Sequence, residues 1–229
     1  MTEQALVTAT GLVKRYGAGS ATVTALDGVD VSVRAGELLA VTGRSGSGKT
    51  TLLHCLSGIT TPDAGAVTFD GIDLGQADDD ARTDLRAERM AFVFQTLNLL
   101  PALTVAENVE LPLVLRGDDA PAIRAAAQQA LADVGLDDRG KAFPAQLSGG
   151  EQQRVAVARG LVTQPDVLWA DEPTGALDTA TASEVMALLR GAADRGVTVV
   201  VVSHAPDVAQ RADRVIAMRD GRVAEISAA

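Results

Sequence analysis

Cysteine is nearly absent from this sequence, which has Cys55 as its one thiol in 229 residues. One thiol cannot build a disulfide framework, and this usage is typical of a reducing compartment. Aromatic residues make up only 3% of the chain, and no apolar run approaches the roughly 20 residues of a membrane-spanning helix. The N-terminus also lacks the basic start and apolar stretch of a secretory signal. We therefore expect a cytosolic protein without a membrane span.

Positive charge is also in short supply. Twenty Lys and Arg residues against thirty Asp and Glu give a formal net charge of −10. Nucleic-acid backbones and anionic lipid surfaces both attract basic protein surfaces. The deficit therefore argues against nucleic acid as a partner and against charge-driven membrane binding. Hydrophobic residues still make up 47% of the chain, enough for a sizeable core at this length.

Short apolar runs indicate the strands. The first are Leu6–Val13, Val23–Val33 and Leu38–Thr42. The second of them alternates around Val29, Val31 and Val33, which is typical of a sheet with one covered face. After Gly43 the pattern changes to strand-like runs separated by helical stretches. The later runs are Ala66–Phe69, Met90–Phe94, Val167–Ala170, Val197–Val202, Val215–Met218 and Val223–Ile226. Those ending at Phe94, Ala170 and Val202 are almost entirely apolar, which predicts parallel strands buried on both faces.

The stretch from about Leu97 to Gln146 is predicted to be helical and contains no strand-like run. Within it, apolar residues recur at helical spacing after Asp119 and Pro121, which predicts a helix starting there. Further helices are expected from Ser148 to about residue 163 and from about Thr181. Residues 78–88 look like an acidic linker. We predict one α/β domain over residues 1–229, with a helical insertion at about 97–163 and no C-terminal regulatory domain.

The strongest motif is a glycine-rich loop between a strand and a helix. It reads GRSGSGKT and fits G-x-x-x-x-G-K-[ST] in the context that this motif requires. Glycines let backbone N–H groups point at phosphate oxygens, Lys49 supplies a charge, and Thr50 offers a hydroxyl to Mg²⁺. The weaker alternative is a turn that only caps the helix. The nucleotide contacts predicted here are Gly43, Arg44, Ser45, Gly46, Ser47, Gly48, Lys49, Thr50 and Thr51.

Two carboxylates follow directly after the apolar run that ends at Ala170. We interpret Asp171 as a residue that reaches Mg²⁺ through its hydration shell, and Glu172 as one that polarises the attacking water. Many strands end in an acidic turn without any function, so this motif gains weight only from the glycine-rich loop upstream.

The positions of these motifs predict that they meet. In open parallel sheets, ligands bind beyond the carboxyl ends of the strands. Gln95 and His204 also follow strand-like runs directly, so we expect them on the same edge. Gln95 would offer an amide to the metal or water, and His204 an imidazole to the γ-phosphate. A lone histidine after a strand is more often a surface residue, and only the shared edge favours a function. His54 and Cys55 are expected to pack in the core.

A second pair of glycines begins another helix, in the sequence LSGGEQQ. Ser148 and Glu151 form a capping box, and the simple alternative is a well-capped helix. Gly149 and Gly150 are costly in a first turn, which favours close approach of an anion to the backbone. The chain has a single glycine-rich phosphate-binding loop (P-loop), GRSGSGKT. The start of this second helix would therefore bind either a second ligand or the far side of the same nucleotide.

Taken together, these motifs resemble the nucleotide-binding subunit of an ABC transporter. The resemblance covers essentially the whole chain and is carried by GRSGSGKT, LSGGEQQ and DEPTGALD. It implies a P-loop NTPase core of α/β class, with an antiparallel β subdomain and a helical insertion. It also implies ATP and Mg²⁺ as cofactors and ATP hydrolysis as the activity. Glu172 and His204 would then be catalytic, with Thr50, Gln95 and Asp171 at the metal.

The resemblance further implies a head-to-tail pair, in which the Ser148 helix of one subunit closes on ATP held by the other. The residues implied at that contact are Ser148, Gly149, Gly150, Gln152 and Asp178. Tyr16 would stack on adenine, whereas without the resemblance a strand-end tyrosine at an interface is the favoured interpretation. The expected partners are a second copy or a paralogous ATPase subunit, and separate transmembrane permease subunits. The chain would be cytoplasmic and peripheral on the inner membrane face, reaching the membrane only through the permease.

Finer features, FQTLNLLP followed by LTVAENV, resemble the lipoprotein-release and macrolide-efflux branch. Leu97, Leu99, Leu100 and Pro101 fall in the first of them. They either seal the junction between core and insertion or border the groove that receives a permease helix. Pro101 prevents a continuous helix there, so not all of the leucines can be buried.

Other functions stay open. A soluble ABC ATPase without a transporter, such as an assembly scaffold, is one alternative, although a single cysteine offers no iron–sulfur ligand set. A DNA-repair ATPase would carry long coiled coils between the motifs. A signalling ATPase that acts across the membrane is not separable from a transporter subunit by sequence. The transported substrate does not follow from this chain either, because its pocket would lie in the permease.

Overall fold

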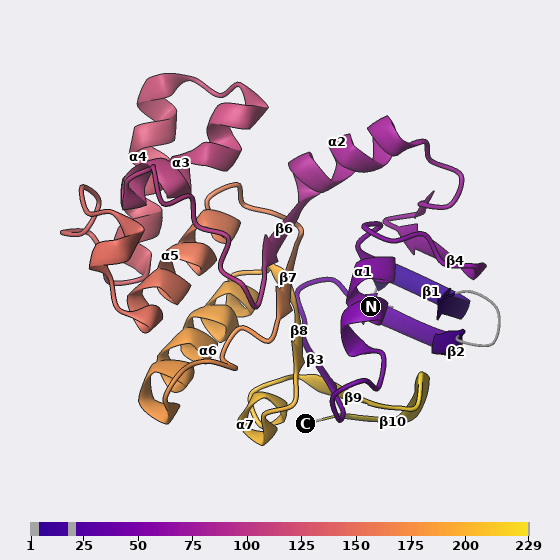
Figure 1. Cartoon of the computed structure of the whole chain (residues 1–229). Coiled ribbons are helices and arrows are strands. Elements are labelled where there is room, and N and C mark those ends of the chain that lie inside the picture. The colour runs from indigo at the N-terminus through magenta and orange to yellow at the C-terminus, as the bar shows by residue number, and fades with distance from the viewer. Residues whose placement is uncertain (1–4, 18–21, 229) are drawn as a thin grey trace.

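The computed structural model describes residues 5–17 and 22–228 and contains two β-sheets (Figure 1). The first sheet is antiparallel, with strand order β2-β1-β4-β5. Its strands are β1 (Ala5–Tyr16), β2 (Val23–Arg34), β4 (Ala64–Phe69) and β5 (Ile72–Asp73). The second sheet has the order β10-β9-β3-β8-β7-β6. Its strands are β3 (Leu38–Thr42), β6 (Met90–Val93), β7 (Val167–Asp171), β8 (Thr198–Ser203), β9 (Arg214–Arg219) and β10 (Arg222–Ala228).

The central strands of the second sheet, β3, β7 and β8, are buried on both faces. Its strands are parallel except β10, which pairs antiparallel with β9. Because successive side chains of a strand point to opposite faces, Val200 and Val202 of β8 pack toward the first sheet, and Val199 and Val201 toward the opposite side. The expectation of parallel strands buried on both faces is confirmed for β6, β7 and β8.

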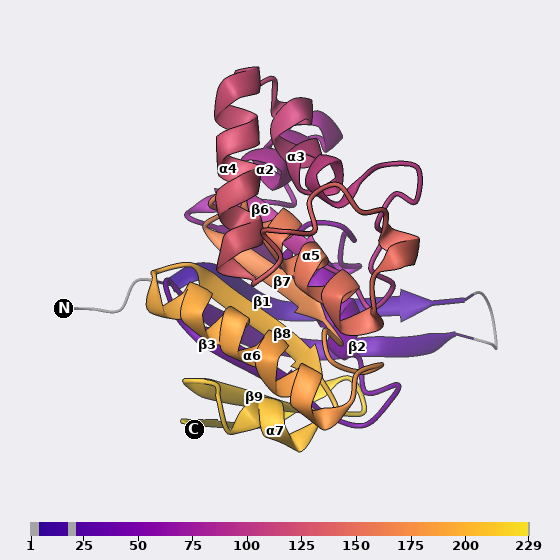
Figure 2. The same cartoon turned by 90° about the vertical axis from the view of Figure 1, so that its left-hand side faces the viewer.

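Helices cover both faces of this sheet. Helix α1 (Lys49–Leu56) lies between the two sheets, where its leucines and Cys55 join the larger core. Helix α6 (Thr179–Asp194) packs on the other face, across β3 and β8 (Figure 2). The short helix α7 (Pro206–Ala209) follows β8.

The remaining helices form a third layer with its own core. Figure 1 shows α3 (Val105–Arg116) and α4 (Ala120–Asp133) grouped on the side of the molecule away from β1 and β2. Helix α5 (Gly149–Leu161), preceded by the 3₁₀ turn Pro144–Gln146, joins this group to the sheet. Its Val155 packs with α3 and α4, and its Ala156 and Val157 pack against the sheet. Residues 97–104 precede the first of these helices and form none.

Three sequence-based expectations need correction. Residues 78–88 are not a linker, because helix α2 (Asp79–Arg89) begins at an N-cap where Asp78 accepts a hydrogen bond from Ala81 N. Strand β4 belongs to the antiparallel sheet, between β1 and β5, and not to the βα series. His54 is half-buried and does not join the core.

None of the helices in residues 5–17 and 22–228 combines the length and the apolar character needed to cross a bilayer.

Candidate functional site: a nucleotide-type cleft

The glycine-rich loop connects the end of β3 to the start of α1. Gly43 and Gly48 have positive φ values of 149° and 100°. A Cβ at Gly43 would lie 2.4 Å from the Met218 carbonyl oxygen, and one at Gly48 would lie 2.3 Å from the Ala25 carbonyl oxygen. No other residue type fits these positions without moving backbone. The loop therefore packs closely against β9 and β2.

Lys49 lies at the base of this loop and is only 6% exposed. Its Nζ donates hydrogen bonds to the carbonyl oxygens of Gly43 (3.0 Å) and Arg44 (3.1 Å). In the described part of the chain, no carboxylate forms an ion pair with it. A buried ammonium group without a direct ion-pair partner is stabilised when an anion binds beside it. The site therefore suits an anionic ligand.

An open cleft of about 900 Å³ lies over the loop. It gathers residues from both sheets, including residues that follow the ends of β3, β6, β7 and β8. Its lining consists of Tyr16, Ala25, residues 43–46, residues 48–51, Gln95, Glu172 and His204. Tyr16 comes from the end of β1 and is 45% exposed, so a face of its ring is available to a ligand. Gln95, Glu172 and His204, which were expected on one sheet edge, thus lie in one cleft, together with Ala25, which the sequence did not single out. Ser47 and Asp171, also predicted at the site, are buried and do not line the cleft.

Asp171 and Thr50 are in direct contact beneath the cleft. Thr50 Oγ1 donates a hydrogen bond to Asp171 Oδ1 at 3.1 Å. Burial raises the pKa of the Asp171 carboxyl, while the Thr50 hydrogen bond opposes that change. Hydroxyl, carboxylate and amide oxygens are the hard ligands that Mg²⁺ prefers, and it keeps several waters when bound. Thr50, Asp171 and Gln95 therefore form a donor set that fits this ion.

Glu172 and His204 form a pair at the edge of the cleft. His204 Nδ1 lies 2.9 Å from Glu172 Oε1, and Ser203 Oγ donates to Glu172 Oε2 at 3.3 Å. Because a carboxylate only accepts hydrogen bonds, Nδ1 is the donor and Nε2 is left for a ligand. The sequence placed both residues on this edge but did not foresee that they touch. Ser203 was missed as a partner, and its position at the end of β8 was the available signal.

The N-terminus of α5 does not line the cleft. Ser148 forms the expected capping box, in which Glu151 N donates to Ser148 Oγ (3.3 Å) and Ser148 N to Glu151 Oε2 (2.8 Å). Gly149 is exposed, with nothing within 4 Å of the space that a Cβ would take. A Cβ at Gly150 would lie 2.3 Å from Thr181 Cγ2. Packing against α6 therefore accounts for Gly150, and Gly149 alone faces open space.

Gln152 and Asp178 also lie outside the cleft. Gln152 Nε2 donates to the carbonyl oxygens of Pro144 (3.0 Å) and Leu147 (3.2 Å). Asp178 caps α6 by accepting from the backbone N–H groups of Ala180 and Thr181, and these hydrogen bonds lower the pKa of its carboxyl. Within this chain, both side chains hold local structure.

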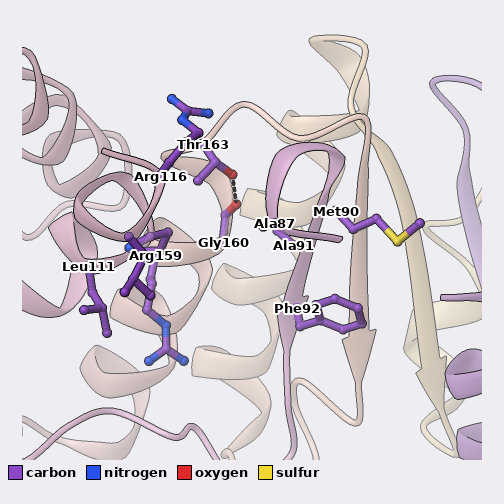
Figure 3. A pocket seen from close by; sticks show the side chains of 11 residues that line it. Ala87, Met90, Ala91, Phe92, Leu111, Arg116, Arg159, Gly160 and Thr163 are labelled. Atoms are coloured by element: carbon purple, nitrogen blue, oxygen red, sulfur yellow. Dashed lines mark hydrogen bonds between the residues drawn. The ribbon is translucent and has the colours of Figure 1, made fainter. Parts of the chain in front are cut away.

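A second concave surface, the α3–β6 groove, lies between the helical layer and the edge of the large sheet (Figure 3). It has a volume of about 280 Å³ and a mainly apolar lining. Its principal residues are Met90, Phe92, Leu111, Leu115, Arg159 and Gly160.

The leucines after Gln95 do not line the α3–β6 groove. Leu97 and Leu99 pack against the neighbouring cores, and Leu100 is 44% exposed. The expectation that not all of these leucines are buried is confirmed. Two of the three therefore seal the junction between core and helical layer.

Fold and cleft together define a P-loop nucleotide-binding protein with two sheets and a helical layer. Residues 26–175 match the ABC transporter family. The chain belongs to the ABC transporter family, and its fold is that of an ABC ATPase domain. A similar solved structure is the ATP-binding cassette MJ0796, described as dimeric, in a post-hydrolysis state and bound to ADP and Pi. It has a TM-score of 0.90 and 38% identity, covering 97% of this chain and 98% of that one.

Two relatives illustrate the range of chain lengths. The Macrolide export ATP-binding/permease protein MacB of Shigella flexneri is 46% identical over 210 residues, which is 92% of this chain. This chain spans about a third of that relative, 32% of its length. The Uncharacterized ABC transporter ATP-binding protein YvrO of Bacillus subtilis (strain 168) is 43% identical, with 95% of each chain covered.

Proposed function

We propose that this chain binds ATP with Mg²⁺ in the cleft and hydrolyses it as one half of a head-to-tail pair. We further propose that hydrolysis drives a membrane permease. The cleft carries this proposal: a buried Lys49 that forms no ion pair in the described residues lies on the same sheet edge as the Glu172–His204 pair. The first feature suits a polyphosphate, and the second suits a water molecule that attacks it.

Each residue of the cleft has a distinct task in this proposal. Lys49 and the loop N–H groups orient the phosphates, and Tyr16 offers its ring to the base. Thr50, Asp171 and Gln95 hold Mg²⁺, which when bound neutralises charge on the phosphate oxygens. Glu172 orients the attacking water and accepts its proton. His204 fixes the Glu172 carboxylate through Nδ1 and directs Nε2 toward the γ-phosphate.

The head-to-tail pair rests on the exposed start of α5. Ser148 and Gly149 are exposed and lie outside the cleft of their own chain. A helix N-terminus with free N–H groups and an uncrowded glycine suits an anion presented by another molecule. The similar MJ0796 cassettes are described as dimeric. A second copy, or a paralogous ATPase subunit, would bring its γ-phosphate to this end, with Gly150, Gln152 and Asp178 holding the surrounding structure.

The α3–β6 groove is the surface that we propose for the permease. The relative MacB is named as an ATP-binding/permease protein, and this chain matches about a third of it. The groove is open and apolar, and Leu115 at its rim is 79% exposed. Exposed apolar residues around a concave surface are typical of a protein interface. A short apolar helix of a permease suits the groove, and this would place the chain at the inner membrane face.

Similarity to MacB also supports the macrolide-efflux side of the branch that the sequence resembles. The transported substrate would be chosen by the permease.

The first test of this proposal is the lysine of the loop. Lys49→Ala removes the buried positive charge, so ATP affinity is expected to fall by about 10- to 100-fold, the scale of a lost charged hydrogen bond. Turnover should fall with it. Equilibrium dialysis with ATP measures the affinity, and a thermal melt checks the fold. Lys141→Ala removes an exposed lysine in the helical layer and serves as the matched control. Unchanged affinity in Lys49→Ala would show that ATP does not bind at this loop.

A further inference from the structure

The segment after Gln95 is held at its start by one arginine. Residues 96–104 form neither helix nor strand. Arg159, in the last turns of α5, donates a hydrogen bond from Nη1 to the Asn98 carbonyl oxygen and another from Nη2 to the Leu97 carbonyl oxygen, both at 2.7 Å. Asn98 adopts a left-handed conformation, with φ of 49°. The Arg159 guanidinium therefore hydrogen-bonds to two consecutive peptide groups, which lie two and three residues beyond Gln95.

The far end of the same segment is held by Asn108 of α3, which is completely buried. Its Nδ2 donates to the carbonyl oxygens of Leu100, Leu103 and Thr104, and its Oδ1 accepts from Leu100 N at 2.8 Å. The segment is thus hydrogen-bonded to Arg159 of α5 at its start and to Asn108 of α3 at its end. These two helices form one wall of the α3–β6 groove.

Arg159 belongs to the groove as well as to the segment. Figure 3 shows it on the same side of the groove as Leu111, opposite Met90 and Phe92. Within residues 5–17 and 22–228, Arg159 forms no ion pair, and burial lowers the pKa of its guanidinium. The two carbonyl groups are its recorded hydrogen-bond partners. Bonds from a charged donor are strong, and their loss is felt when the donor is half-buried.

We infer that Arg159 is a positioning residue that mechanically connects the α3–β6 groove to Gln95. A permease helix that enters the groove would contact the Arg159 side chain. Any shift of that side chain moves the peptide groups of Leu97 and Asn98, and with them the Gln95 amide in the nucleotide cleft. This inference rests on the proposed function, because it assumes that Gln95 serves ATP hydrolysis. Its first test does not depend on nucleotide at all.

That first test is hydrogen–deuterium exchange on the nucleotide-free chain. Arg159→Met keeps much of the side-chain length but removes both hydrogen bonds. The amide groups of Leu100 and Leu103, which are hydrogen-bonded in the structure, are expected to exchange faster. Arg159→Lys keeps the charge but not the two-pronged geometry, so it should give an intermediate rate. Arg116→Met, which changes another groove arginine whose guanidinium bonds to Asp118, should leave these amides unchanged.

The second test is a double-mutant cycle in steady-state ATP hydrolysis. Arg159→Met is expected to lower kcat by about tenfold with little change in KM, the scale of lost charged hydrogen bonds. In a Gln95→Ala background the same change should cause no further loss, because its effect passes through Gln95. Arg116→Met should lower kcat in neither background. If a thermal melt shows that Arg159→Met is unfolded, Arg159→Lys replaces it in the double-mutant cycle.

Unchanged exchange at Leu100 and Leu103 would overturn the inference. So would independent, multiplicative effects of the Arg159 and Gln95 substitutions on kcat, even if exchange becomes faster. The wild-type chain separates these results from failure of the proposed function. If it hydrolyses ATP and Lys49→Ala does not, the proposed function stands whatever Arg159 does.

Discussion

Glu172 occupies the point where the chain leaves β7, and its backbone is left-handed, with φ of 48°. Non-glycine residues hold this conformation only when their surroundings fix it. Here, Glu172 N donates to the Val202 carbonyl oxygen at 2.8 Å, and Ser203 and His204 both contact the carboxylate. Backbone and side chain are therefore tied to the end of β8. This explains how an exposed sheet edge presents a carboxylate in one fixed orientation.

Glu151 gives a residue-scale prediction about pH. Hydrogen bonds from Ser148 N and from the Ser148 hydroxyl, followed by one from Arg139, lower the pKa of its carboxyl to about 2 from 4.5. A depressed pKa means that the ionised form stabilises the fold. This stabilisation is complete above pH 4.5 and is lost as the pH falls toward 2.

Glu151→Gln is therefore expected to be less stable than wild type at pH 7, by about 1 kcal/mol or less given its exposure. The difference should shrink between pH 4.5 and 2. Urea denaturation across this range measures it. Glu225→Gln removes the same charge from an exposed strand position and is the control. A difference that grows as the pH falls would contradict the role of Glu151 as an ionised cap.

At the scale of elements, α5 combines three regions with separate tasks. Its N-terminus presents Ser148 and Gly149 outward, its middle joins the helical core to the sheet, and its last turns carry Arg159. Gly160 lets the helix lie close to the sheet, since a Cβ there would be 2.9 Å from Leu168 Cδ1.

Ser148→Arg tests the outward end of α5. The added guanidinium is expected to clash with the γ-phosphate held by a second copy, while the loop of its own chain stays intact. ATP binding should survive within about twofold, and hydrolysis should fall by about 100-fold or more, the scale of losing a transition-state contact. Loss of the cap costs about 1 kcal/mol, which a thermal melt detects.

Ala125→Arg places the same charge on an exposed position of α4 and should change neither quantity. Mixing Ser148→Arg with Lys49→Ala subunits can restore at most one intact composite site per pair. Normal hydrolysis by Ser148→Arg alone would mean that this helix end is a capped helix and nothing more.

Helix α3 offers a matched pair for the permease surface. Leu115 lines the α3–β6 groove and is 79% exposed, whereas its neighbour Val114 is 54% exposed and does not line it. Leu115→Asp places a charge in an apolar interface, so co-purification with the permease from detergent is expected to fall at least tenfold. Val114→Asp should assemble normally. Neither change should alter the melting temperature by much, because both side chains are exposed. Equal assembly of the two variants would argue against docking in this groove.

The sequence predicted the elements that have a strong local signal and missed those that depend on tertiary contacts. Apolar runs identified β7 and β8 because strands buried on both faces need nearly continuous apolar residues. Helix α2 was missed because none of its side chains is fully buried and only Leu85 packs against the core. Its available signals were the Asp78 N-cap, the acidic first turn and the arginines of the last turn. Gly150 also packs closely against Thr181, a contact between two helices that no local pattern encodes, and its approach to an anion stays a prediction.

At the scale of the whole molecule, charge and assembly depend on each other. The chain carries a net charge of −10, so two copies repel each other and each repels a nucleotide polyanion. Affinity must then come from local contacts at the loop, and pairing must wait for a ligand that both copies contact. We therefore expect the chain to be monomeric without nucleotide.

The most direct measurement of the central claim is the mass of Glu172→Gln in solution with and without MgATP. This change keeps the size of the side chain and one oxygen that accepts a hydrogen bond, but it removes the carboxylate that accepts the proton. Hydrolysis should fall by about 100-fold or more, so ATP persists in the cleft and holds two copies together. Size-exclusion chromatography with light scattering should show a dimer with MgATP and a monomer without it. Adding Ser148→Arg to the same chain should restore the monomer. A Glu172→Gln variant that binds MgATP yet stays monomeric would contradict the shared ATP site.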